Sequence, residues 1–281
     1  MNRKVLQTLE YHKIISQLIL KADSEPGKKM CEALLPDTDL SEIQSAQTET
    51  ADALSRLFRY GSTSFGGNKD LGFSLKSLEV GSSLSIPELL KIAGFLENAA
   101  RIKAYGRNEK DESFQDSLSQ LFEDLTSLSF ISDEIRRCLL SEEEVADDAS
   151  SELKRIRRNI QLTGEKIHNQ LGSMLSGSCR TYLQDAVITM RGDRYCLPIK
   201  AEFKNQVSGL VHDQSATGST FFIEPAAVVE LNNHLRELAI DEQKEIERIL
   251  ADLSAQISVH TKELSNNQRI MTRLDFVFAK G

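Results

Sequence analysis

The chain has 281 residues and a formal net charge of −8, from 34 Lys and Arg against 42 Asp and Glu. Apolar residues make up 40% and charged residues 27%, which excludes a disordered tail, and no apolar run approaches the roughly 18 residues that a bilayer span needs. The first residues lack the continuous apolar segment of a secretion signal, so a cytoplasmic protein without a membrane partner is expected. The acidity excludes a protein that coats DNA with its whole surface but leaves room for a local basic site.

The first 140 residues have the composition and rhythm of consecutive short helices. Apolar residues recur every three or four positions, Pro26 is placed for a first helical turn, and a Gly- and Ser-rich stretch interrupts the pattern once. The predicted elements are a helix within 5–19, a helix beginning at Ser24, a helix over 39–60, a loop over 61–81 and a helix over 86–105. Residues 109–148 are strongly acidic but keep an apolar stripe, so a folded helical segment with an acidic solvent face is expected there.

Two long helices are predicted in the second half of the chain. Residues 150–177 carry a coiled-coil-like apolar seam, and a second seam begins near Pro225 and continues to Leu264. The first helix has an excess of basic residues and the second an excess of acidic ones, which favours antiparallel pairing of the two. A register in which paired residue numbers sum to 403 places Lys154 and Arg158 beside Glu245 and Glu247.

Between these helices the hydrophobic period changes from helical to alternating. Residues 186–203 alternate around the tight-turn signal Arg191-Gly192-Asp193, and residues 207–225 contain two further short strands joined by a Ser/Gly turn. The fold class is therefore mainly α with a small, roughly four-stranded β insert on a long two-helix arm. We refer to residues 178–225 as the insert.

The common catalytic motifs are missing from this sequence. It has no Walker loop, no HExxH, no GxSxG and no GxGxxG, and its four cysteines have no metal-site spacing, so no catalytic residue, cofactor or metal is expected. His212, Asp213 and Ser215 supply the side chains of a hydrolase triad. Neighbours along a strand point to opposite faces, however, so a turn is the better interpretation of these residues.

The insert also carries five basic residues, which are balanced by five acidic ones. Arg191 and Arg194 flank a hairpin turn, where long side chains can reach phosphates. Solubilising surface charge is the competing interpretation. The candidate nucleic-acid contacts are Arg180, Arg191, Arg194, Lys200 and Lys204, with Gln214 and Ser219 as weaker candidates in the second hairpin.

Three segments carry a specific resemblance to a known family: RGDRYCLPIKAEF at 191–203, GLVHDQSATGSTFFIEPAAVVELNNHLREL at 209–238 and RLDFVFAK at 273–280. They resemble the N-terminal region of the bacterial MutS-two family, the MutS relatives that lack the mismatch-reading domain. The resemblance implies a helical core and ascending lever arm at 1–177, a β-rich clamp at 178–225 and a descending arm at 226–281. It also implies that the chain is a fragment, because family members continue into a dimerising ATPase domain, which would bind ATP and Mg, and usually an Smr nuclease domain.

The family resemblance implies two physiological targets, branched DNA in suppressing homologous recombination and the rRNA of collided ribosomes in their rescue. Two hypotheses follow for this chain. In the first, it is a non-catalytic module that grips nucleic acid or the ribosome within a homodimeric ATPase and endonuclease. In the second, it is a structural and dimerisation scaffold whose clamp contacts protein.

Overall fold

The computed structural model describes residues 3–107, 114–177 and 179–281, and the chain divides into two compact units. The first unit comprises Met1–Ala146 and Leu250–Gly281, and the second comprises Asp147–Ile249. None of the helices within the described ranges is long and apolar enough to cross a membrane. The helices of the first unit are α1 (Arg3–Thr8), α2 (Tyr11–Lys21), α3 (Glu25–Glu32), α4 (Leu40–Tyr60), α5 (Gly72–Glu79), α6 (Ile86–Gly106), α7 (Ser119–Glu123), α8 (Ser129–Cys138) and α11 (Thr261–Lys280).

The core of the first unit forms around α6 and α11, the two helices with the most buried residues. α6 begins with a capping box between Ser85 and Glu88, with Pro87 in its first turn, so its start is encoded locally. α11 packs against α3 and α4. Aromatic rings join these elements at edge-to-face or tilted contacts of 5.5–6.2 Å between centroids, among Phe65, Tyr105, Phe122 and Phe278.

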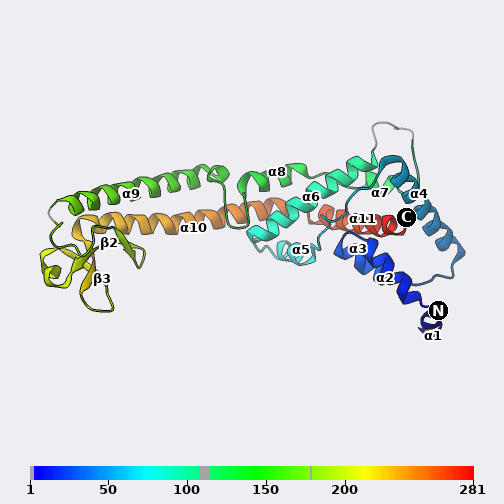
Figure 1. Cartoon of the computed structure of the whole chain (residues 1–281). Coiled ribbons are helices and arrows are strands. Elements are labelled where there is room, and N and C mark those ends of the chain that lie inside the picture. Colours follow the sequence, from blue (N-terminus) through cyan, green and yellow to red (C-terminus); the bar gives the residue numbers. More distant parts are fainter. Residues whose placement is uncertain (1–2, 108–113, 178) are drawn as a thin grey trace. The chain divides into compact units, whose positions relative to one another are not determined.

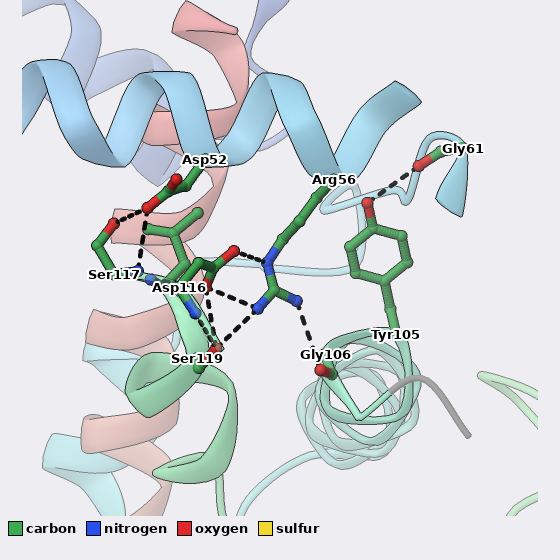
Figure 2. A network of polar contacts seen from close by, with 9 residues as sticks. Asp52, Arg56, Gly61, Tyr105, Gly106, Asp116, Ser117 and Ser119 are labelled. Atoms are coloured by element: carbon green, nitrogen blue, oxygen red, sulfur yellow. Dashed lines mark hydrogen bonds and ion pairs between the residues drawn. The ribbon is translucent and has the colours of Figure 1, made fainter. Parts of the chain in front are cut away.

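A buried ion pair fixes α4 against the end of α6 and the segment before α7 (Figure 2). Arg56 and Asp116 are only 1% and 4% exposed, and two nitrogens of the guanidinium contact the carboxylate at 2.6 and 2.8 Å. Arg56 also donates to Ser119 at 3.0 Å and lies 4.7 Å from the ring centroid of Phe122. Burial alone would raise the pKa of Asp116, but the hydrogen bonds and charge of Arg56 hold that pKa below its ordinary value.

A second buried carboxylate, Asp275 on α11, accepts hydrogen bonds from the start of α3. It accepts hydrogen bonds from the backbone N–H groups of Asp23 and Ser24 at 3.0 and 2.9 Å and from the Ser24 hydroxyl. Ser24 is at the same time the N-cap of α3, as its position in the sequence predicts. Burial raises the pKa of Asp275. The packing here is tight, since a Cβ added to Gly27 would lie 2.0 Å from the carboxylate.

The sequence predictions for the first unit need three corrections. The stretch 61–81 is not all loop, because it contains α5, which buries Leu75 and Leu78. The acidic segment is only partly helical, with α7, α8 and an isolated bridge between Leu139 and Val145, and its residues 109–113 lie outside the described residues. The second long helix does not continue to Leu264, because α10 ends at Ser258 and a separate helix, α11, begins at Thr261.

Within the second unit, α9 (Ser151–Ser176) lies antiparallel to the first part of α10 (Val229–Ser258), as the charge pattern predicts (Figure 1). Arg157 contacts Glu242 at 2.7 Å and the Ser150 hydroxyl donates to Glu245 at 2.6 Å. The predicted register is therefore wrong by about one turn, since it places Arg157 opposite Ile246. Acidic residues recur along α10, so alignments one turn apart bring together similar numbers of opposite charges and the charge count cannot select one.

The insert folds as a four-stranded antiparallel sheet with strand order β1-β2-β4-β3, which confirms the mainly α fold with a small β insert. Its elements are β1 (Thr189–Arg191), β2 (Arg194–Lys200), the short 3-10 helix η2 (Ala201–Gln206), β3 (Gly209–Gln214) and β4 (Thr220–Pro225). The β1–β2 turn has Gly192 and Asp193 at φ of 54° and 60°, the conformation of a two-residue hairpin turn. Further 3-10 helices lie at Asp147–Ala149 and Ala226–Val228.

Candidate nucleic-acid interface

One face of the insert's sheet is apolar and packs on the ends of the paired helices. Leu197 and Ile199 of β2 and Ile223 of β4 are buried together with Ile167 and Leu171 of α9. Of the four aromatic residues that the sequence favours as the insert's own core, Tyr195, Phe203 and Phe221 are partly buried against this cluster, whereas the Phe222 ring lies 3.9 Å from the guanidinium of Arg191. This core holds the sheet against the paired helices.

The opposite face carries a buried carboxylate, Glu224, with three polar partners. Arg194 donates to it at 3.1 Å and Asn232 of α10 donates at 2.8 Å, while His212 Nε2 lies 2.5 Å from its second oxygen. Glu224 is fully buried and the Arg194 side chain is only 15% exposed. Asn232 also accepts from the backbone N–H of Tyr195 at 3.2 Å, so this network ties β2, β3 and β4 to α10. Because its charge is committed to this buried contact, Arg194 has a structural role.

Arg191, the other hairpin arginine, makes a more exposed contact on the same face. Its Nε lies 3.1 Å from a carboxylate oxygen of Asp213, and its guanidinium lies 3.9 Å from the ring centroid of Phe222. A bulge in β3 makes this contact possible, because after Val211 the register shifts and Asp213 pairs with Phe222. Residues opposite each other share a face, so without the bulge Asp213 would face the other side of the sheet.

The remaining three basic candidates lie on segments that meet at the end of the sheet where β2 passes into η2. The backbone N–H of Lys200 donates to the carbonyl of Tyr182 at 2.9 Å, so the segment that carries Arg180 runs beside this end. Lys204 projects from η2, and its Nζ lies 4.4 Å from the ring centroid of Phe221. Arg180 and Lys204 are exposed and Lys200 is half-buried, and none of the three has an ion pair within residues 3–107, 114–177 and 179–281. We call Arg180, Lys200 and Lys204 the tip cluster.

The weaker candidates, Gln214 and Ser219, serve the β3–β4 turn itself. The Gln214 side-chain amide donates to the carbonyl of Gly218 at 3.2 Å, and the Ser219 hydroxyl lies 2.8 Å from that of Thr217. Gly218 has φ of 73°, which a tight turn of this kind requires. Both side chains are exposed, and the backbone bond from Ala201 to Ser219 at 2.9 Å places the turn next to η2 and hence next to the tip cluster.

Nucleophilic chemistry is not supported in the insert. His212 turns to Glu224, while Ser215 accepts a hydrogen bond from the backbone N–H of Thr220 at 3.1 Å, so the two do not form a triad with Asp213. Burial, followed by the charge of Glu224, raises the pKa of the Cys196 thiol to about 11, so this cysteine stays protonated at neutral pH. Among the residues that the structure describes, no cluster of His, Cys, Asp or Glu could hold a metal ion.

The first unit contains an open groove of about 740 Å³ between α3, α4 and α11. Two of its basic residues are already neutralised, Lys29 by Asp70 at 3.7 Å and Arg273 by Glu49 at 2.6 Å. A third basic residue of the groove, Arg269, has no ion pair in the described part of the chain. The groove therefore offers one unpaired cation against three in the tip cluster, which is the better candidate for phosphate.

The sequence is similar over its whole length to curated proteins named Endonuclease MutS2. It is 53% identical to the protein of Agathobacter rectalis and 52% identical to that of Lachnoclostridium phytofermentans, and it covers 36% of each. It is 48% identical to the protein of Lachnospira eligens, of which it covers 35%. The chain belongs to the MutS2 family. It corresponds to an N-terminal part of these relatives and spans about a third of their length. No protein-family model matches the sequence.

Sequence reasoning identified the basic residues of this MutS2 region but not how they divide. It named five cations as candidates together, whereas Arg191 and Arg194 contact carboxylates and the other three have no ion pair among the residues that the structure describes. Glu224 and Asn232, which hold Arg194, were not candidates. An isolated Glu in an otherwise apolar strand, TFFIEP, was the available signal, because a carboxylate there needs a buried partner.

Proposed function

We propose that the second unit of this MutS2-family chain is a non-catalytic module that grips the phosphate backbone of nucleic acid through the tip cluster. The observation that carries the proposal is that Arg180, Lys200 and Lys204 lie on segments that meet at one end of the sheet, without carboxylate partners in the described residues. Unpaired cations at a surface bind phosphates by releasing the counterions of the nucleic acid. The buried sheet core and the helices α9 and α10 give these side chains a firm base.

Contacts of this kind recognise backbone shape and charge and do not read bases. Lysine and arginine that meet phosphate position a protein on nucleic acid but carry no sequence information directly. The aromatic side chains beside the cluster are occupied: Phe221 packs on the core and under Lys204, and Tyr182 packs on Phe203 at 5.1 Å. The module would therefore bind nucleic acid without sequence preference.

The same phosphate chemistry is available from two sources, branched DNA and the rRNA of a ribosome. In the longer MutS2 proteins, the module would serve a homodimeric ATPase and endonuclease that needs ATP and Mg. It would suppress homologous recombination in the first case and rescue collided ribosomes in the second. Both roles belong to the proposal for the whole protein.

A protein-contacting scaffold is the second candidate, and strand β3 favours it. β3 is an edge strand that is exposed along its whole length, including Leu210 at 53% and Val211 at 44%. Exposed strand edges pair with other chains, although the bulge at Val211/Asp213 weakens this edge as a template. In this case the tip cluster would not contribute to binding.

The test compares the 281-residue chain with a variant that carries Arg180→Gln, Lys200→Gln and Lys204→Gln. We expect the wild-type chain to bind a four-way DNA junction or purified ribosomes at low salt and the variant to lose most of that affinity. Of the junction and the ribosome, the one that the wild-type chain binds more tightly identifies the target. Equal affinity of the two chains for both targets would reject the tip cluster and support the scaffold.

A further inference from the structure

The contact between Arg191 and Asp213 differs from the other ion pairs of the insert in its exposure. The two side chains are 39% and 51% exposed, and the contact is made through Nε at 3.1 Å. One further guanidinium nitrogen donates to the carbonyl of Met190 at 2.8 Å. An arginine has five N–H donors, so donors of Arg191 remain for another partner. Pairs this exposed contribute little to stability and exchange partners readily.

From this geometry we infer that Asp213 is an intramolecular competitor for nucleic-acid phosphate, which sets the affinity of the insert by neutralising Arg191. The inference rests on the proposed function. Arg191 lies on the Phe222 ring on the face of the sheet that carries Glu224, and Asp213 reaches that face only because of the β3 bulge. In the free protein the Asp213 carboxylate occupies the position beside Arg191 that a phosphate would take. Nucleic acid would have to displace it.

The opposite role for Asp213, orienting Arg191 toward phosphate, does not fit the charge balance. If Arg191 kept Asp213 while binding a phosphate, one positive charge would face two negative groups at close range. Like charges this close repel, so the approach of nucleic acid would favour separation of the pair. Removing the carboxylate should then add one effective cation to the interface.

The experiment uses Asp213→Asn in the 281-residue chain, with Asp193→Asn as the matched control. Asp193 lies in the β1–β2 turn that follows Arg191, is exposed and has no ion pair within the described ranges, so its removal changes the net charge equally. One additional phosphate contact steepens the salt dependence by about 0.9 and tightens binding about tenfold at 50 mM salt. Binding of a fluorescent four-way DNA junction, measured by anisotropy from 50 to 300 mM salt, gives both quantities.

We expect Asp213→Asn to show this full effect, Asp193→Asn to show much less, and Asp213→Asn to show no tightening in an Arg191→Gln background. Weaker binding by Asp213→Asn, or tightening equal to that of Asp193→Asn, would overturn the inference. A wild-type chain that binds neither the junction nor ribosomes would instead overturn the proposed function. Unchanged circular dichroism and melting temperature of Asp213→Asn would show that the measured difference comes from binding.

Discussion

The two units of this chain each contain an arginine–aspartate pair, and the pairs are built differently. In the first unit Arg56 and Asp116 are 1% and 4% exposed, with two nitrogen–oxygen contacts and further bonds to Ser119 and the carbonyl of Gly106 (Figure 2). In the second unit Arg191 and Asp213 are 39% and 51% exposed, and Nε of Arg191 lies 3.1 Å from the carboxylate. The first pair cannot be separated without leaving a buried charge, whereas the second can exchange one partner for water or phosphate.

This comparison shows that exposure and partners, more than residue type, decide which charges are available for binding. Arg194 illustrates the point inside the insert. It flanks the same turn as Arg191, yet its contact with the fully buried Glu224 makes it resemble Arg56. The predictions that follow test this division into structural and exchangeable charges.

The largest effect is expected for Arg56→Met. This change leaves the Asp116 carboxylate buried without its partner, so the free energy of unfolding of the first unit should fall by about 3–5 kcal/mol. Urea unfolding followed by circular dichroism measures the loss. Arg136→Gln is the control, because the exposed pair of Arg136 with Glu97 should contribute no more than about 1 kcal/mol. Equal losses in the two variants would contradict the account.

The next largest effect is expected for Glu224→Gln. An amide carries no negative charge to pair with the buried Arg194 guanidinium, so the sheet should lose about 1.5–3 kcal/mol. Hydrogen exchange of amides within 194–225 measures the local opening free energy. Asp213→Asn, which breaks the exposed pair, should change the same amides by less than about 1 kcal/mol. Faster exchange in Asp213→Asn than in Glu224→Gln would reverse the assignment of the two pairs.

Lys204→Gln and Arg194→Gln should separate binding from stability. Removing one phosphate contact at Lys204 should weaken junction or ribosome binding about tenfold at 50 mM salt, with no change in hydrogen exchange of the sheet. Arg194→Gln should instead speed exchange and leave the salt slope unchanged. Parallel anisotropy and exchange measurements on both variants check this. A lower salt slope in Arg194→Gln would show that Arg194 contacts phosphate.

The smallest effect concerns pH and the start of α9. Hydrogen bonds from Arg248, opposed by desolvation and joined by the Ser150 hydroxyl, lower the pKa of Glu245 from 4.5 to about 2. The stability that this carboxylate contributes should be fully present above about pH 4.5 and lost as the pH falls through 2, because the folded state binds the proton more weakly. The stability difference between wild type and Glu245→Gln should therefore shrink across this range. A constant difference from pH 6 to pH 2 would contradict the role of the charge.

Much of the fold follows from local sequence signals, and the exceptions have physical reasons. The α3 start with Pro26, the helix α6 and the four strands were predicted because each rests on neighbouring residues, and the pairing of α9 with α10 was predicted from their opposite charges. α5 was missed because Gly and Ser surround it, although Leu71, Leu75 and Leu78 have helical spacing. The break before α11 was missed because Ile257 and Leu264 are seven residues apart, which continues the helical rhythm across it.

The candidate site was less predictable than the fold. Which of the five cations are paired depends on side chains distant in sequence, such as Asp213 for Arg191 and Asn232 and Glu224 for Arg194. The Asp213 contact depends on a one-residue bulge, and a shift of one residue moves a side chain to the other face of a sheet. The predicted register of α9 against α10 was wrong for a related reason, because long charged side chains can still form ion pairs when one helix is displaced by one turn.

The central claim is that the tip cluster binds phosphate. The most direct test is the slope of the logarithm of affinity against the logarithm of salt concentration, for the wild-type chain and for the variant with Gln at positions 180, 200 and 204. Because the variant can no longer neutralise three phosphates, the magnitude of its slope should be smaller by about 2.7 for duplex DNA. A variant whose slope equals that of the wild type would contradict the claim, since Arg180, Lys200 and Lys204 of the wild-type chain would then take no part in binding.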